Sequence, residues 1–88
     1  MQYRAIKISS RDNVAIAAST IPKGATVTII DGGELVSSQE IPLGHKVALN
    51  QIARGADVIR YGEAICQASE EIKPGDWVHV HNTSSKIA

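Results

Sequence analysis

Residues Ile21-Pro22-Lys23-Gly24-Ala25-Thr26-Val27 introduce a pattern, I-x-x-G-x-x-V, that returns at residues 52–58 and 72–78. In each copy an apolar residue precedes a tight turn, where glycine supplies a left-handed backbone, and a β-strand begins after the turn. The copies start 31 and 20 residues apart, and this inequality excludes a solenoid of equal repeats. The pattern therefore predicts one kind of corner, used three times in a chain of long bent hairpins.

The segments around the corners predict short β-strands. Runs of β-branched or small apolar residues lie near residues 6–8 and at 14–18, 26–30, 35–36, 46–49, 58–61, 64–68 and 77–81. We expect residues 14–18 to be buried on both faces, and the paired glycines within residues 31–34 predict a hairpin turn. Gly or Pro interrupts every candidate helix, so only residues 49–54 are left for one helical turn. These signals predict a compact all-β fold of short strands.

The length of 88 residues allows one domain, which we expect to span residues 1–88 with a core from about 12 to 82. A chain this short buries only about 60–65% of its unfolded surface, so such domains often depend on a partner. Cys66 is the only cysteine, which excludes an internal disulfide and fits a reducing compartment. It lies in an apolar run, where we expect a small buried hydrophobic residue rather than a nucleophile. The sequence has neither a signal-peptide core nor an apolar run of membrane length, so the cytoplasm is expected and a membrane is not.

Charge and aromatic content argue against nucleic acid as a partner. Nine basic residues balance nine acidic ones, and the basic residues form no cluster. Tyr3, Tyr61 and Trp77 are too few to supply a base-stacking platform. Nucleophile-elbow, P-loop, dinucleotide-binding and C-x-x-C motifs are also absent from the sequence. A domain of this size lacks the walls of a deep pocket, so we expect any active site to be completed by another chain.

The segment W-V-H-V-H-N near the end of the chain is the first candidate site. As one continuous strand it would aim Val78 and Val80 at the core, and Trp77, His79 and His81 at the opposite face. Side chains two residues apart on a strand have Cα atoms about 6.5–7 Å apart, which lets two imidazoles reach one divalent metal or one anionic substrate. The alternative is an exposed edge strand whose histidines bind nothing.

A second candidate is Gly44-His45-Lys46, at the junction of a loop and a strand, where binding and catalytic residues concentrate. A histidine beside a lysine offers a proton acceptor or metal ligand next to an anion-binding ammonium group. A solvated turn is the alternative. His45, His79 and His81 are all the histidines of the chain, and if they converge, three imidazoles can serve one ligand.

Three further polar positions are weaker candidates. Asp12-Asn13 predicts an Asx turn before the apolar run, with a ligand contact as the alternative. Arg60 has the geometry to bind a carboxylate through two nitrogens, although surface arginine is usually only solvated. Asn82 lies at the end of a predicted strand, where amides cap turns or bind ligand hydroxyls.

Four segments occur together, in this order and at roughly this spacing, in one protein family: residues 12–17, 44–49, 59–63 and 77–82. The chain resembles the N-terminal SAF domain of altronate and galactarate dehydratases, the UxaA family. The specific part is the combination of G-H-K-V-A-L at residues 44–49 with H-V-H-N at residues 79–82. One departure is Cys66, where the family often has glycine.

The resemblance implies a β-clip fold, a small barrel-like domain also known from antifreeze-like proteins. It implies a cytoplasmic hydro-lyase that eliminates water from a 2-hydroxy acid and yields a 2-keto-3-deoxy acid. It also implies a divalent metal, iron or manganese, bound mainly by a large catalytic subunit of the UxaA type. In the family the SAF domain is either fused to that region or separate, as in sulfolactate sulfo-lyase. Because six residues follow Asn82, we expect a separate small subunit, active only in a hetero-oligomer; a piece of a longer protein would look the same.

On this basis we expect His45, His79 and His81 to be catalytic, with His79 and His81 as candidate metal ligands. The candidate substrate-binding residues are Lys46, Asn82, Asp12 and Arg60. Two other functions stay open: the small subunit of a sulfolactate sulfo-lyase, and a non-catalytic SAF module for ligand binding or assembly. When isolated, the chain is expected to form a homo-oligomer if it associates at all.

Overall fold

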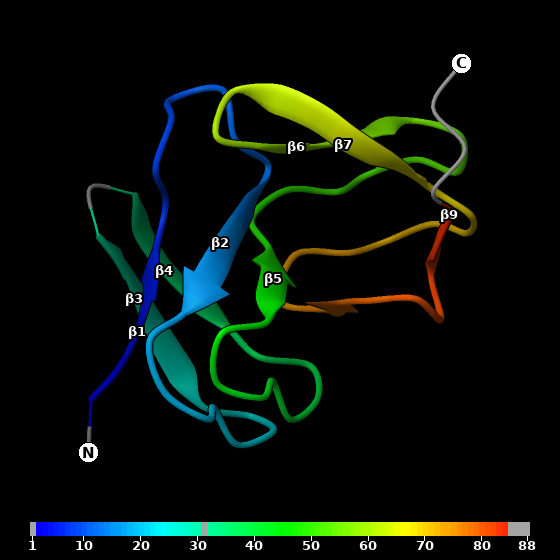
Figure 1. Cartoon of the computed structure of the whole chain (residues 1–88). Helices are drawn as coiled ribbons and strands as arrows, with labels where there is room; N and C mark the ends of the chain where they lie inside the picture. The colour runs from blue at the N-terminus through cyan, green and yellow to red at the C-terminus, as the bar shows by residue number, and fades with distance from the viewer. Residues whose placement is uncertain (1, 31, 85–88) are drawn as a thin grey trace.

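Every regular element in the described chain is a β-strand (Figure 1). The computed structural model describes residues 2–30 and 32–84. The nine strands are β1 (Tyr3–Ile6), β2 (Val14–Ala17), β3 (Thr26–Ile30), β4 (Gly33–Val36), β5 (Lys46–Ala48), β6 (Asp57–Arg60), β7 (Glu63–Ala68), β8 (Trp77–Val78) and β9 (Thr83–Ser84). The all-β class is confirmed. The helical turn considered at residues 49–54 is not formed, because Ile52 pairs with Ile72 in a β-bridge instead.

The strands form a curled six-stranded sheet, ordered β4-β3-β1-β2-β5-β8, and a three-stranded sheet, ordered β6-β7-β9. All named pairings are antiparallel except that between β1 and β3. Figure 1 shows the β6–β7 hairpin lying across one end of β2 and β5. Asn13 joins the two sheets, because its side-chain oxygen accepts from the Ile59 N–H at 2.7 Å and its amide donates to the Asp57 carbonyl at 2.9 Å. The result is the small barrel-like fold that was expected.

The corner pattern occurs four times, not three. The additional copy runs from Ile41 to Val47, and the four anchoring isoleucines pair as Ile21 with Ile41 and Ile52 with Ile72. The four corner glycines have positive φ values: Gly24 79°, Gly44 81°, Gly55 86° and Gly75 91°. Each corner thus needs the left-handed conformation that glycine adopts without steric cost.

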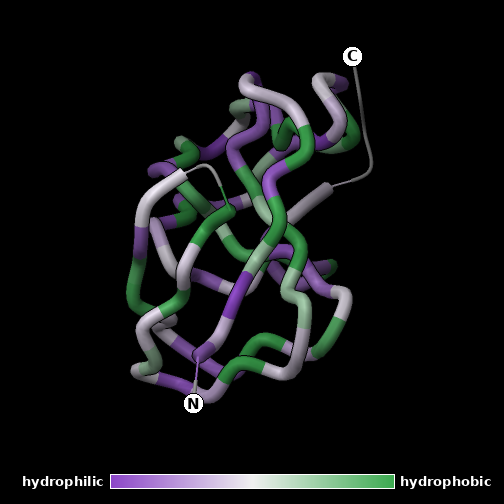
Figure 2. Tube along the Cα trace, turned by 90° about the vertical axis from the view of Figure 1, so that its left-hand side faces the viewer, coloured by the Kyte–Doolittle hydropathy of each residue, from purple (hydrophilic) through white to green (hydrophobic). Residues whose placement is uncertain are grey.

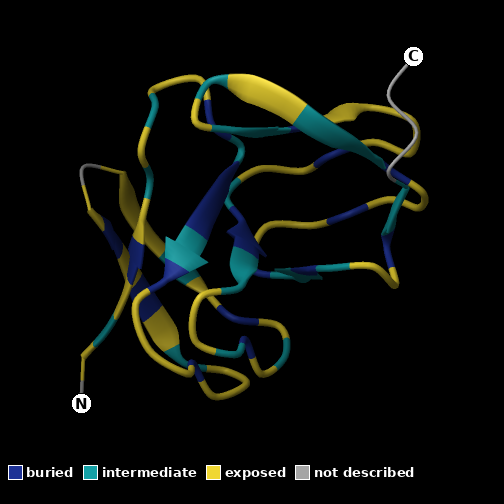
Figure 3. Ribbon diagram, viewed as in Figure 1, coloured by how far each residue is buried: buried dark blue, intermediate teal, exposed yellow. Residues whose placement is uncertain are grey.

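The four corners divide the chain into two similar halves offset by 31 residues, each with its own small core. One buried cluster contains Ala5, Ala15, Ala17, Ile21, Val27, Ile29, Ile41 and Val47. The other contains Val14, Ala48, Ile52, Val58, Ala68, Ile72 and Val78. Strand β5 serves both clusters, because consecutive side chains on a strand point to opposite faces. Figure 3 shows buried residues on the central strands β2 and β5, while the turns around them are exposed.

Two strand boundaries differ from the expectation. The first strand occupies Tyr3–Ile6 instead of the region of residues 6–8, and Ile8 is 57% exposed. Tertiary pairing explains the shift, because Ala5 is the residue that packs inward between Ala17 of β2 and Ile29 of β3. Strand β2 is buried at three of its four residues, as expected. The hairpin turn between β3 and β4 falls partly on Asp31, which lies outside the described residues.

Apolar segments along the trace are short and alternate with polar ones (Figure 2). In the described part of the chain, no helix has the length and apolar character needed to cross a membrane.

Candidate functional site

The chain turns immediately after β8, so the last histidines do not lie on a continuous strand. Asn82 braces this turn: its side-chain oxygen accepts from the His79 N–H at 3.0 Å, and its amide donates to the Trp77 carbonyl at 2.9 Å. Thr83 adds a hydroxyl bond to the His79 carbonyl at 2.8 Å. The expectation that Val80 faces the core is therefore wrong, because Val80 sits in the turn and is 78% exposed.

The turn nevertheless brings three imidazoles around one indole. The Trp77 ring stacks on His79, with ring centroids 5.2 Å apart and planes 8° apart. His81 lies on the same indole at 5.1 Å between centroids. His45, from the residue before β5, lies 5.6 Å from the Trp77 ring and 4.7 Å from the His79 ring. These four residues are called the histidine cluster below.

The contacts of His45 and His79 within the cluster differ in kind. Trp77 Nε1–H donates a hydrogen bond to His45 Nδ1 at 3.1 Å. Partial removal from water lowers the pKa of His79, and the nearby charges of His45, Lys46 and His81 lower it further. His79 is therefore expected to be neutral at neutral pH and able to accept a proton. Lys46, the first residue of β5, contributes the positive charge beside it.

The histidine cluster does not by itself fit a divalent metal. Across residues 2–30 and 32–84, no three side chains of the histidine, cysteine or carboxylate type are placed to share one ion. One nitrogen of His45 is also taken by the indole N–H. Protein zinc sites have three or four such ligands, and at most part of that set is available here. The iron or manganese implied by the resemblance stays a prediction.

A titration tests the electrostatics of the cluster. The imidazole proton signals of His79, followed by NMR, should show a midpoint below the ordinary histidine value of about 6.5. Lys46→Met should raise that midpoint, because it removes one of the charges that oppose protonation. Lys7→Met, at the other end of β2, should leave the midpoint unchanged. A His79 midpoint that is unchanged in Lys46→Met and shifted in Lys7→Met would refute this arrangement.

Asp12 lies away from the histidine cluster, before the start of β2, and braces two turns. It is 3% exposed, and its two carboxylate oxygens accept from the Gly62 N–H at 2.8 Å and the Ser9 N–H at 3.0 Å. Burial by itself would raise the pKa of Asp12, but backbone N–H donors outweigh it and the pKa is lowered. The side chain thus ties the loop before β2 to the β6–β7 turn. This contact to Ser9 runs backwards along the chain and is not the Asx turn that was expected.

Replacing this carboxylate should cost stability in a pH-dependent way. Asp12→Asn should lower the free energy of unfolding at neutral pH by about 1–3 kcal/mol, because one charge-assisted acceptor is lost. The pKa of Asp12 is lower in the folded state, so its contribution is present above the unfolded value of about 3.9 and is lost as the pH falls through the folded value. Urea denaturation should therefore show a difference in the free energy of unfolding between the wild type and Asp12→Asn near neutral pH, and this difference should become smaller in strong acid. A difference in the free energy of unfolding that becomes larger in acid would contradict the role of the Asp12 carboxylate as an acceptor.

Arg60 and Cys66 are also not part of the histidine cluster. The Arg60 guanidinium donates to the Tyr61 hydroxyl at 2.8 Å and lies 4.5 Å from the centre of that ring, at the turn that contains Gly62. Cys66 is half-buried, less buried than expected, because β7 is fully buried only at its last residue, Ala68. Burial raises the pKa of its thiol, and this outweighs the opposite influence of Lys46 and Thr83. The raised pKa favours the protonated thiol over the nucleophilic thiolate. The substrate-binding role assigned to Arg60 stays a prediction, as do those of Asp12 and Asn82.

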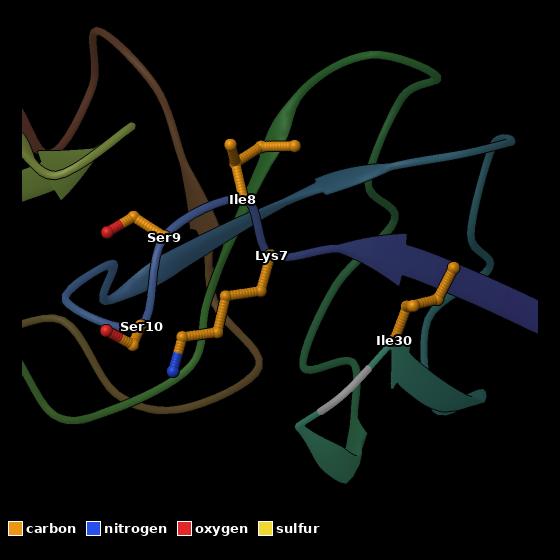
Figure 4. A pocket seen from close by; sticks show the side chains of 5 residues that line it. All are labelled: Lys7, Ile8, Ser9, Ser10 and Ile30. Carbon is orange, nitrogen blue, oxygen red and sulfur yellow. The ribbon is translucent and has the colours of Figure 1, made fainter.

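A shallow hollow of about 230 Å³ lies at the opposite end of β2 from the histidine cluster (Figure 4). It is lined by Lys7, Ile8, Ser9, Ser10 and Ile30. The two sites are at opposite ends of β2. Residues 7–10 of the hollow come before the first residue of β2, whereas His45 lies beside its last residue, because the His45 carbonyl accepts a hydrogen bond from the Ala17 N–H. We give more weight to the histidine cluster, because it combines aromatic contacts with titratable groups and the hollow offers a single ammonium. Two exposed apolar residues, Leu43 at 63% and Val80 at 78%, lie within two residues of cluster histidines.

The role of Trp77 in this site was not predicted from the sequence. The spacing placed the indole on the same face as His79 and His81, but gave no reason to expect a bond to His45. That bond joins residues 32 positions apart and depends on the pairing of β5 with β8, in which Val47 lies opposite Trp77.

Comparison with known proteins gives a consistent result. Residues 3–86 match the family model described as the altronate/galactarate dehydratase SAF domain. The chain is 42% identical over all 88 residues to altronate dehydratase of Escherichia coli K12, and 42% identical over 73 residues to its galactarate dehydratase (L-threo-forming). It is also 40% identical over 52 residues to the (2R)-sulfolactate sulfo-lyase subunit alpha of Paracoccus pantotrophus.

The share of each relative that the chain covers differs greatly. The matches span 17% of the altronate dehydratase and 14% of the galactarate dehydratase, against 100% and 83% of this chain. For the sulfo-lyase subunit the match spans 78% of that protein and 59% of this chain. The chain belongs to the SAF domain family of altronate and galactarate dehydratases.

Proposed function

We propose that this chain is the SAF part, as small subunit or N-terminal domain, of a sugar-acid lyase that removes water from a 2-hydroxy acid. The product is a 2-keto-3-deoxy acid. The observation that supports this most is the gathering of the three imidazoles of the chain around Trp77, beside the ammonium group of Lys46. A family relationship alone would not predict which surface of the domain takes part.

The reaction needs a proton acceptor, a proton donor and positive charge, and we assign the acceptor and the charge to the cluster. A base removes the proton from the carbon that carries the carboxylate, the hydroxyl on the next carbon leaves as water, and the resulting enol becomes the 2-keto acid. This carbon acid is weak, so the negative charge that develops on the carboxylate must be stabilised. In our proposal His79, kept neutral by its surroundings, accepts a proton, and Lys46 faces the carboxylate.

We further propose that a large catalytic region completes the site in the cytoplasm. The cluster lies at the surface of a domain of 88 residues, while the dehydratases it resembles are about six times longer. Leu43 and Val80, both exposed, border the cluster and suit a surface that another protein covers. The metal belongs to this proposal with most of its ligands outside the chain, because the described residues offer no set of three.

Reconstitution tests the proposal. The chain is produced together with a large UxaA-type catalytic subunit, and formation of 2-keto acid is measured from altronate, galactarate and sulfolactate. We expect turnover of one acid by the pair, and none by the chain alone. Stable association without turnover of any of the three acids would contradict the lyase proposal and favour a non-catalytic SAF module.

The second candidate function is a sulfolactate sulfo-lyase subunit, in which sulfite leaves in place of water. One observation supports it: the chain is 41% and 40% identical to two sulfo-lyase subunits alpha, over 46 and 52 residues. The same assay separates the two functions, because release of sulfite from sulfolactate, without turnover of altronate or galactarate, supports the sulfo-lyase.

A further inference from the structure

Trp77 touches all three histidines but has only one polar group to direct at them. Its indole N–H donates to His45 Nδ1 at 3.1 Å. An indole nitrogen only donates, so the Nδ1 atom that receives this bond carries no proton. The proton of a neutral His45 ring is therefore on Nε2.

The fold holds both partners of this bond in place. Trp77 lies opposite Val47 in the pairing of β8 with β5, and its backbone N–H donates to the Gln39 side chain at 3.3 Å. The His45 backbone is fixed from both sides, because its N–H donates to the Pro42 carbonyl at 3.0 Å and its carbonyl accepts from Ala17 at 2.9 Å. The flat stacking of the indole on His79 further limits its rotation.

The remaining nitrogen of His45 is available to a ligand. Within the described residues Nε2 makes no hydrogen bond, and it is not among the buried side-chain atoms that lack a partner. It therefore reaches the surface of the cluster as a free N–H donor. A protonated Nε2 cannot coordinate a metal, but it can bond an oxygen of an anionic ligand.

We propose that Trp77 is a positioning residue that holds His45 as the Nε2–H tautomer, so that this N–H meets an oxygen of a hydroxy-acid ligand. The ligand class rests on the proposed function, whereas the tautomer rests on the geometry alone. The proposal assigns different tasks to two neighbouring rings: His45 donates a hydrogen bond, and His79 is left to accept a proton. It also removes His45 from the set of metal ligands.

The test is a two-bond 1H–15N correlation spectrum of the complete 15N-labelled chain, at a pH about two units above the ordinary histidine value of about 6.5. In the wild type, His45 Nε2 should show the shift of a protonated ring nitrogen and Nδ1 that of an unprotonated one. Trp77→Phe keeps an aromatic ring against His79 but removes the donor, so the two His45 shifts should move toward the average of mixed tautomers. A wild-type His45 protonated on Nδ1, or a spectrum unchanged by Trp77→Phe, would overturn the proposal.

A second measurement covers the case in which Trp77→Phe does not fold. His45→Ala should then move the indole N–H signal of Trp77 and speed its exchange with solvent; an unaltered indole signal would overturn the proposal.

In the reconstituted lyase, Trp77→Phe should reduce turnover about 10–100-fold, by analogy with the loss of hydrogen-bond partners that orient metal-binding histidines. Inactivity of the wild-type pair with the expected tautomer would reject the proposed function alone. Full activity with the opposite tautomer would reject the positioning role alone.

Discussion

Gly75→Ala should leave the domain largely unfolded, whereas Gly24→Ala should leave it folded and moderately less stable. Both glycines have positive φ, 91° and 79°, where an alanine costs about 1–2 kcal/mol. They differ in their surroundings. A Cβ on Gly24 meets nothing within 4 Å, but a Cβ on Gly75 would overlap the carbonyl oxygen of Val36.

Overlap with a backbone atom cannot be relieved by a change of rotamer. Overpacking of this kind adds about 1–3 kcal/mol or more to the conformational cost. The total loss expected for Gly75→Ala is about 2–5 kcal/mol, which at its upper end equals the whole stability of a marginal small domain. Urea denaturation followed by circular dichroism measures both variants. Equal losses for the two would show that segment 36–38 does not pack against the fourth corner as described.

His79→Ala/His81→Ala should reduce turnover of the reconstituted lyase by at least about 100-fold, the lower end of what acid–base groups contribute. The variant should still fold, with a loss in the free energy of unfolding of about 1–3 kcal/mol, because both rings pack on Trp77 but neither is buried. These two expectations together separate a functional role from a structural one.

The matched control is Lys7→Ala/Ser10→Ala, which alters the hollow at the other end of β2 and should leave turnover unchanged. Retained turnover in the histidine variant would reject the assignment of the site. Loss of turnover in Lys7→Ala/Ser10→Ala, together with full turnover in the histidine variant, would indicate that the hollow is the functional site.

Local signals predicted the parts of the fold that depend on local chemistry. Three of the four corner glycines were predicted because a positive φ restricts the choice of residue, and Val14–Ala17 was predicted because it is apolar throughout. The parallel pairing of β1 with β3 and the start of β1 at Tyr3 could not be predicted in this way, because distant strands fix both. The fourth corner, at residues 41–47, also matches the pattern in the sequence, but its G-H-K segment was interpreted only as a candidate site.

The candidate site shows the same division. Alternation along a continuous strand predicted that Trp77, His79 and His81 would lie on one face. The three rings do lie together, but a turn braced by Asn82 brings them there, and the continuous strand is not formed. Of the two alternatives for Asn82, the turn cap is confirmed: its side chain bonds the backbone of His79 and Trp77 and is 3% exposed. The position of His45 depends on the pairing of β5 with β8 and is a tertiary feature.

In the proposed lyase, the catalytic region covers one surface of the domain, made of the histidine cluster with Leu43 and Val80. Hydrogen–deuterium exchange of the chain, free and bound to the large subunit, tests this directly. We expect slower exchange on binding in peptides covering residues 42–49 and 76–84, with residues 7–12 unchanged. Protection of residues 7–12, with the two histidine-bearing segments exchanging as in the free chain, would contradict the account.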